Sequence, residues 1–261
     1  MTVARLAWHK AAIDLRMTFS SPKDLFNMSI FVILMLAAAF AQWDHRGVVL
    51  LGGMSLMPAV GAMLSIPSLI ALEKTDGTIL RRKNIPRGIP AYVAARIIYT
   101  TVTSFVSLLP LLVVVFATSA DLPAGVWDVV LALLIIMFGG AALVPLGVAV
   151  GALLPNPREA VAMVSFPFML IAGVSGVLTP DQGLPNWLKY AADVFPLAWM
   201  TRGTRDAFAG HLGTFPGWIF VLVCVGWLSA GSLLAVPLMR AMVRKQTGAS
   251  LIRRKDKASV A

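Results

Sequence analysis

The hydrophobic residues of this chain gather into six long and nearly continuous runs, separated by shorter polar stretches. A helix needs roughly 20 mostly apolar residues to cross about 30 Å of hydrocarbon. Because the apolar positions are continuous rather than alternating with a period of two, they predict membrane-spanning helices and argue against a transmembrane β-barrel. The predicted spans cover residues 25–43, 47–72, 95–118, 128–154, 160–179 and 215–239. The expected fold is therefore all-α and integral to the membrane.

The first 24 residues are too polar for a span, but drawn as a helix they are amphipathic. Such a helix suits the headgroup plane, with its apolar side in the acyl boundary. Ser21 and Pro22 then break it before the first span. One apolar side is formed by Ala4, Trp8, Ala11, Leu15 and Phe19, and a second stripe by Leu6, Ile13 and Met17. Residues 1–24 are expected to form an interfacial helix, and a frayed N-terminus is the alternative.

The composition supports a membrane protein. The chain is 58 % hydrophobic and 13 % charged, with a mean hydropathy of +0.82. Soluble domains carry about 25 % charged residues, and disordered chains have low hydrophobicity, so both classes are excluded. The single cysteine, Cys224, excludes an internal disulfide.

The net charge of +10 reflects an uneven distribution of basic residues. Of the 22 Lys and Arg, 18 fall in the first 24 residues, the 73–96 loop, the 155–159 turn and the tail from Arg240. By the positive-inside tendency these segments are cytoplasmic, and so are both termini. Topology and anionic lipids therefore account for the charge better than nucleic acid does.

The sequence shows no arrangement typical of an enzyme or a metal site. His9, His45 and His211 are too scattered to bind a metal together, and a phosphate-binding loop is excluded because the chain has no Gly-Lys pair. All acidic residues fall in loops or at span ends, which leaves no obvious site for a driving ion. The chain is expected to be passive or powered by a partner. An ion-coupled transporter or a membrane-embedded enzyme is the alternative, with Asp193 and Asp206 as a candidate carboxylate pair; a non-transporting scaffold fits the proline-containing spans poorly.

The 73–96 loop contains signals for a short helix held below the membrane. Gly77 permits a sharp turn, and Thr78 can cap a helix. Pro86 would end that helix, and Pro90 suits the first turn of the next span. A rigid basic helix could receive force from a cytoplasmic partner, although a solvated basic loop fits the spacing equally well.

The stretch before the last span predicts two short amphipathic helices, over residues 184–194 and 196–209. Each is too short to cross a bilayer. Their aromatic residues suit the membrane interface: Trp187, Tyr190, Phe195 and Trp199. We expect residues 180–210 to form an external re-entrant hairpin against a pore or a dimer seam, with a surface-lying loop as the alternative.

Together these features resemble the membrane subunits of ABC type-2 exporters, which include bacterial drug-export and polysaccharide- or lipid-export permeases. The resemblance covers nearly the whole chain as a single transmembrane domain. It rests on Glu-x-x-x-Gly-Thr from Glu73 to Thr78, Ser-Gly-Val-x-x-Pro from Ser175 to Pro180, Leu184-Pro185, Phe195-Pro196-Leu197 and Arg202. The basic run at 81–83 departs from the commoner, more apolar pattern and puts the partner specificity in doubt.

The resemblance implies a multi-pass permease of the bacterial cytoplasmic membrane, working by alternating access with two separate ATPase subunits and a second permease copy or homologue. It implies no cofactor in this chain, because the ATPase subunits bind ATP and Mg. The residues implied to couple to the ATPase are Glu73, Gly77, Thr78, Ile79, Leu80, Arg81 and Arg82. The residues implied for the re-entrant gating segment are Ser175, Gly176, Pro180, Pro185, Phe195, Pro196 and Arg202.

The cargo and the subunit contacts are less defined. Methionines spread through the spans provide adaptable apolar surface, and few aromatic residues are placed to stack on sugars. We therefore expect a drug-like, antibiotic-like or lipid-like cargo rather than a polysaccharide. Small residues at Gly147-xxx-Gly151 and Gly226-xxx-Ala230 permit close helix packing, either within the chain or between subunits. The basic tail, residues 240–261, is expected to be cytoplasmic.

Overall fold

The computed structural model describes residues 2–42, 45–76, 88–118, 124–154, 157–177 and 185–245. Within these ranges the chain is helical apart from short turns and contains no strand, which confirms the predicted all-α fold. The elements are α1 (Val3–Ser20), α2 (Pro22–Ala41), α3 (Arg46–Val60), the π-helical turn η2 (Gly61–Ser65), α4 (Ile66–Thr75), α5 (Gly88–Thr118), α6 (Val126–Leu153), α7 (Pro157–Val174), α8 (Asn186–Asp193), α9 (Pro196–Phe208), η4 (Leu212–Thr214) and α10 (Gly217–Lys245).

Five helical segments in the described ranges are long and apolar enough to cross a membrane. Four of them are the single helices α2, α5, α6 and α10. The fifth is the continuous helical unit formed by α3, η2 and α4. The predicted span at 160–179 corresponds to α7, whose apolar described part, Ala162–Val174, is shorter. The structure therefore supports a multi-pass membrane protein, and the sixth span stays a prediction.

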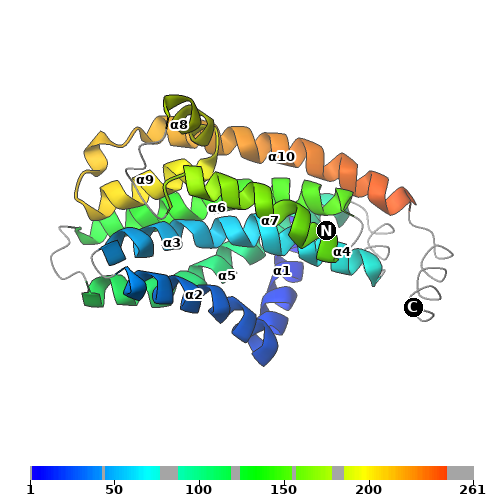
Figure 1. Ribbon diagram of the computed structural model, residues 1–261. Helices are drawn as coiled ribbons and strands as arrows, with labels where there is room; N and C mark the ends of the chain where they lie inside the picture. Colours follow the sequence, from blue (N-terminus) through cyan, green and yellow to red (C-terminus); the bar gives the residue numbers. More distant parts are fainter. Residues whose placement is uncertain are drawn as a thin grey trace.

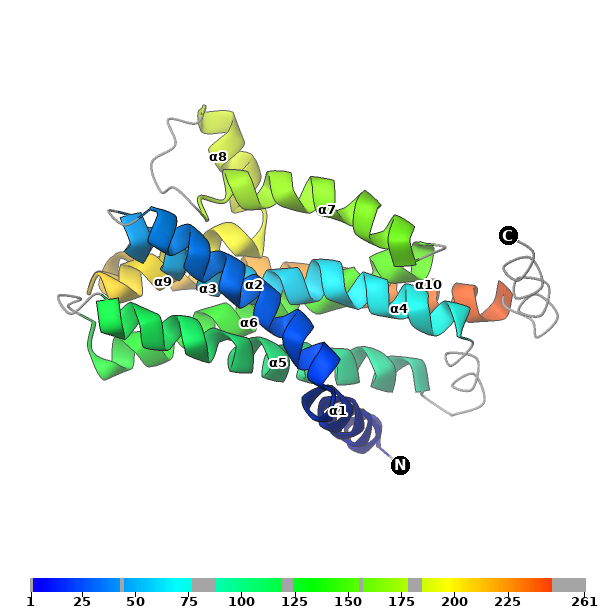
Figure 2. The same ribbon diagram turned by 60° about the horizontal axis from the view of Figure 1, so that its bottom comes forward.

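The long helices lie side by side, with α6 packed against α10, α9, α4 and α5 (Figure 1). In both ribbon views α9 and the end of α4 lie at opposite ends of the bundle (Figures 1 and 2). One glycine sets a close contact at the centre of this packing: a Cβ at Gly147 would lie 1.9 Å from the backbone oxygen of Ala62. The small residues at Gly147 and Gly151 thus bring α6 against η2 and α4 within the chain, whereas a Cβ at Gly226 would meet nothing within 4 Å.

The N-terminal helix is separate from the first span, as predicted. Ser21 adopts an extended backbone, its hydroxyl accepts a hydrogen bond from the Asp24 amide at 3.3 Å, and Pro22 begins α2. The buried side of α1 is Ala7, Ala11, Asp14 and Thr18. The assignment of Ala11 to a lipid-facing side was therefore wrong, because the small residues of α1 pack against Ala94, Ala95 and Ile98 of α5.

Two proline positions shape the unit from α3 to α4. Pro58 lies inside α3, and Pro67 lies in the first turn of α4. Between them the Ile66 amide donates to the Gly61 carbonyl, five residues back, so that the turn is wider than an α-helical turn. Because proline lacks an amide hydrogen and crowds the preceding turn, it disturbs regular hydrogen bonding along a helix. A π-turn inside a long helix often marks a functional position.

The third span begins earlier than expected. The sequence predicts a span from residue 95 with Arg96 at the end of a loop, but α5 begins at Gly88. Pro90 lies in the first turn of this helix, as predicted. Arg96 therefore lies more than two turns inside a helix rather than in a loop, and its side chain is buried.

Candidate functional site

The most unusual buried group in the described residues is the guanidinium of Arg96. Its side chain is 2 % exposed and ranks first by volume among the fully buried side chains. Removing such a charge from water costs several kcal/mol unless opposite charges and hydrogen bonds compensate. Its partners therefore decide whether this position is stable.

Two carboxylates from two other helices pair with Arg96. Its Nη1 lies 3.2 Å from Oδ2 of Asp14 on α1, and its Nη2 pairs with Oε1 of Glu73 on α4. The acid side chains are 8 % and 17 % exposed. Lys10 also pairs with Asp14, and the Tyr92 hydroxyl donates to Oε2 of Glu73 at 2.8 Å. We call Asp14, Glu73, Tyr92 and Arg96 the ion-pair junction.

Aromatic rings on α5 enclose the guanidinium. The Arg96 Cζ lies 4.8 Å from the ring centre of Tyr92 and 5.7 Å from that of Tyr99. Tyr92 lies four residues before Arg96 and Tyr99 lies three residues after it, so the three side chains share one face of α5. The hydroxyls of Tyr99 and Thr18 lie 3.0 Å apart, within hydrogen-bond distance. The helix α1 is thus attached to α5 at two consecutive turns, through Asp14 and Thr18.

Two residues of the ion-pair junction flank residues 77–87 of the predicted coupling segment in the chain: Glu73 precedes them and Arg96 follows them. Glu73 is in the last turn of α4, close to Asp76, where the described chain stops, and α5 resumes at Gly88. Of the predicted coupling residues the structure describes Glu73 alone, and its carboxylate contacts α5 rather than facing away from the helices. The other predicted residues, Gly77, Thr78, Ile79, Leu80, Arg81 and Arg82, lie outside the described residues.

Sequence reasoning missed the roles of Arg96, Asp14 and Tyr92. It placed all acidic residues in loops or at span ends, whereas the structure buries Asp14 within α1 and pairs both Asp14 and Glu73 with one arginine. The available signal was Tyr92-x-x-x-Arg96-x-x-Tyr99, an arginine between two tyrosines on one helical face beside an apolar run. The partner acids lie 82 and 23 residues away in the chain, so their contacts could not be read from spacing.

The opposite end of the bundle is built from α8, α9 and the end of α7. The observed helices agree with the two predicted amphipathic pieces to within about two residues at each end. Pro185 immediately precedes α8, and Pro196 is the first residue of α9. Most of α9 is buried against α6 and α3, whereas α8 exposes Trp187 and Tyr190. The pair is therefore not a simple surface loop, since α9 belongs to the packed core.

Side-chain contacts hold α8 to α9 and α10. Arg202 pairs with Asp193, and its Cζ lies 5.4 Å from the ring centre of Trp199. Phe195, which precedes α9, stacks on Trp227 of α10 with ring centres 5.1 Å apart. Of the predicted gating residues, Phe195, Pro196 and Arg202 are thus brought together at this end.

The end of α7 is also tied to α9. Gly176 has φ 72°, a left-handed conformation that favours glycine after a helix. Arg205 of α9 donates to the Val177 carbonyl at 3.0 Å, and Ser175 beside this turn is buried. The predicted residue Pro180 lies outside the described residues.

The two carboxylates of the enzyme alternative, Asp193 and Asp206, have different surroundings in the structure. Arg202 pairs with Asp193. Burial raises the pKa of Asp206, and the positive charges of His211 and Arg202 oppose this shift. In the described part of the chain no group of three or more His, Cys, Asp or Glu residues is arranged to bind a metal.

Comparison with protein families gives a match that covers more than half of the chain. The family described as ABC-2 type transporter matches residues 14–209, a range that contains Asp14, Glu73, Arg96 and all of α9. A search of curated proteins returns no match. Members of this family are the membrane components of ABC transporters and work with an ABC ATPase partner. The chain therefore belongs to the ABC-2 type transporter family.

Proposed function

We propose that the chain is one permease half of an ATP-driven exporter, in which a separate ATPase acts on residues 77–87 and the ion-pair junction transmits the movement. The observation that carries this proposal is the position of Glu73 and Arg96. They lie on either side of residues 77–87 in the chain and pair with each other. Force applied to this segment would reach α4 and α5 together.

The junction suits transmission because its parts are costly to separate. Removing one partner of a buried ion pair costs about 3–5 kcal/mol, since the other charge stays buried. The helices α4 and α5 would therefore move as one body, and α1 would follow through Asp14 and Thr18. This supports alternating access, in which packed helices switch between discrete arrangements.

The external end would act as the gate. In the proposal α7 is the remaining span, and α8 and α9 form a re-entrant pair in the outer leaflet. The contact of Arg202 with Asp193 holds α9 to α8, and the contact of Phe195 with Trp227 holds this pair to α10. A functional assembly would contain two permease halves, identical or related, and two ATPase subunits that bind ATP and Mg.

The proposed setting is the bacterial cytoplasmic membrane, with both termini cytoplasmic and α1 in the headgroup plane. The proposed cargo is an amphipathic drug-like, antibiotic-like or lipid-like molecule that leaves the cell. The alternative of an ion-coupled carrier is less favoured, because the buried Asp14 and the partly buried Glu73 are engaged by Arg96 instead of being available to a driving ion.

The experiment is reconstitution of the full chain in proteoliposomes with and without its ATPase. We expect no transport by the chain alone. With the ATPase, Ile79→Asp should abolish transport, because a charge replaces an apolar docking contact, while Asn84→Asp in the same segment should retain most of it. Transport at the full rate without any ATPase, or equal transport by both variants, contradicts the proposal.

A further inference from the structure

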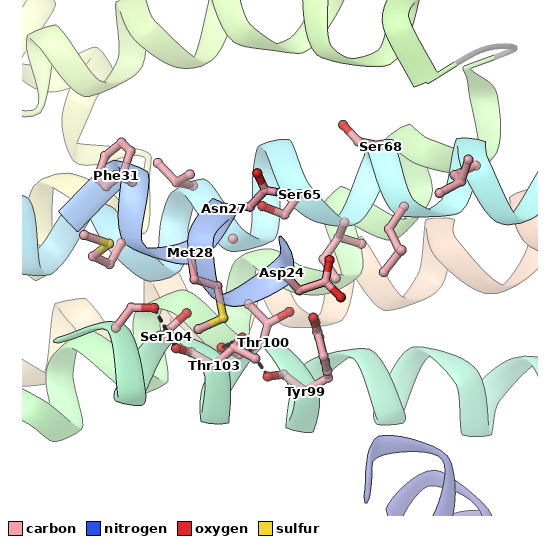
Figure 3. A pocket seen from close by; sticks show the side chains of 17 residues that line it. Asp24, Asn27, Met28, Phe31, Ser65, Ser68, Tyr99, Thr100, Thr103 and Ser104 are labelled. Carbon is pink, nitrogen blue, oxygen red and sulfur yellow. Dashed lines mark hydrogen bonds between the residues drawn. The ribbon is translucent and has the colours of Figure 1, made fainter. Parts of the chain in front are cut away.

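A groove runs between α2, the unit from α3 through α4, and α5, and its volume is about 460 Å³. Figure 3 shows side chains of α2, among them Asp24, Asn27 and Met28, near those of α5, with Ser65 and Ser68 contributed from the α3–α4 unit. The volume lies within the range of small-molecule sites, roughly 300–1,000 Å³. The groove is thus large enough for a drug-sized molecule.

The walls of the groove are amphipathic. The apolar lining consists of Met28, Phe31, Met57, Val60, Ile66, Leu69 and Leu72. The polar lining is mainly a row of hydroxyls on α5: Tyr99, Thr100, Thr103, Ser104 and Ser107. Flexible methionines and aromatic rings adapt to apolar bodies of varied shape, so this lining suits an amphipathic ligand rather than a sugar.

One hydroxyl of this row lacks a hydrogen-bond partner in the described part of the chain. Thr100 is 3 % exposed, and its Oγ1 has no recorded partner there. The hydroxyls of Thr103 and Ser107, in contrast, donate to backbone carbonyls of their own helix. Burying a hydroxyl without a partner carries a free-energy cost, because its hydrogen bonds to water are not replaced. A polar group of a bound molecule would remove this cost.

The π-turn η2 forms the wall opposite Thr100. A Cβ at Gly61 would lie 3.1 Å from Cγ2 of Thr100, tighter than most real contacts, and 3.5 Å from Oγ of Ser104, an ordinary contact distance. The missing side chain of Gly61 thus lets η2 pack closely against Thr100 of α5 beside the groove. Gly61 is also the first residue of the π-turn η2, so the wider turn and the glycine lie at the same level of the groove.

The charge of the groove selects for a cation. Asp24, in the first turn of α2, is the single carboxylate in the lining, and no Lys, Arg or His lines the groove in the described residues. No ion pair is recorded for Asp24 within the described ranges. The neighbouring Asn27 adds an amide. Attraction between this carboxylate and an ammonium group would strengthen binding and set the orientation of the ligand.

We propose that this groove binds an amphipathic organic amine, with its ammonium group at Asp24 and its apolar body along Met28, Phe31 and Val60. The inference rests on the proposed transport function and names the cargo class. The groove is connected to the ion-pair junction, because Tyr99 lines the groove, contacts Thr18 and lies beside Arg96. Occupancy of the groove is therefore expected to alter the junction.

The test is equilibrium binding to the full chain in phosphatidylcholine nanodiscs, without ATP or ATPase. The probe is a dansyl-labelled dodecylamine with a free terminal ammonium, and the matched probe is its neutral N-acetyl derivative. Empty nanodiscs correct for partitioning into lipid. We expect the charged probe to bind on the order of tenfold more tightly than the neutral one, as one charge-assisted contact predicts.

The variants locate this preference. Asp24→Asn should remove it, Asp24→Glu should retain most of it, and Thr100→Val should weaken binding of both probes a few-fold. The control is Asp128→Asn, which changes a carboxylate in the first turn of α6 and should leave the preference intact. Each variant is first checked for an unchanged size-exclusion profile.

Three results overturn the inference. They are equal binding of both probes, a preference that persists in Asp24→Asn, and displacement of both probes alike by added phosphatidylglycerol, a lipid without an amine, which would make the groove a general lipid site. The measurement needs no ATPase, so its failure leaves the proposed coupling untouched. Failure of ATP-dependent transport, in turn, does not alter the binding result.

Discussion

Replacing Arg96 with methionine tests whether the ion-pair junction stabilises the bundle. The substitution keeps an unbranched apolar side chain at a position that is 2 % exposed, but it leaves Asp14 and Glu73 without their shared cation. Lys10 still pairs with Asp14, and Tyr92 still donates to Glu73. Because both acids keep one partner, we expect a loss of about 3 kcal/mol, the lower end of the range for a broken buried pair.

The matched control is Arg202→Met. Arg202 also pairs with an aspartate and lies over an aromatic ring, but its side chain is 44 % exposed. Exposed ion pairs contribute about 0–1 kcal/mol because water screens them. The two substitutions thus compare the same chemistry at a buried and an exposed position.

The assay is chemical unfolding of the full chain in detergent micelles, followed by tryptophan fluorescence. Arg96→Met should lower the free energy of unfolding by at least 2 kcal/mol more than Arg202→Met does, a margin set by the buried and exposed ranges above. The triple variant Arg96→Met, Asp14→Asn, Glu73→Gln should recover much of the loss, because it removes the uncompensated charges. Equal losses for the two single variants would refute the reasoning.

Two further predictions concern packing and the contact between α1 and α5. Gly147→Val should lower the free energy of unfolding by about 3 kcal/mol, since its Cβ would overlap the Ala62 carbonyl. Gly226→Val should change the free energy of unfolding by less than about 0.5 kcal/mol, because a Cβ at Gly226 meets nothing within 4 Å. The same unfolding assay compares the two variants. Tyr99→Phe should cost about 1 kcal/mol by removing the contact with Thr18 and should reduce the stimulation of ATP hydrolysis by cargo in the reconstituted complex. Stimulation equal to that of the wild type would show that α1 takes no part in coupling.

The sequence predicted the features that depend on local chemistry. Prolines and aromatic residues before the last span marked two short helices, and the structure has α8 and α9 in those places. The break at Ser21 and the position of Pro90 in the first turn of a helix were also predicted correctly. The family resemblance is confirmed over residues 14–209. These features follow from residues close together in the chain.

The features that sequence reasoning missed depend on distant residues. Whether Arg96 ends a loop or lies within a helix depends on Asp14 and Glu73, which neutralise its charge from other helices. The side of α1 that contacts protein was misassigned for the same reason. Amphipathicity identifies an apolar side, but only the neighbouring small residues of α5 show that Ala7 and Ala11 pack there. The groove likewise requires three segments far apart in the sequence.

The helix α5 connects the two sites that the proposals join. Arg96 lies in the ion-pair junction, and Tyr99 and Thr100, three and four residues later, line the groove. A residue three or four positions away on a helix lies about one turn, roughly 5 Å, along the axis. A movement of α5 that carried Arg96, and Glu73 of α4 with it, would therefore also move the hydroxyl row of the groove. Because coupling between two sites is reciprocal, a cargo that prefers one position of α5 must shift the junction by the same free energy. Cargo-stimulated ATP hydrolysis is therefore the expected signature of an intact ion-pair junction. In Arg96→Met, where the junction is broken, we expect this stimulation to be lost while the ATPase stays bound.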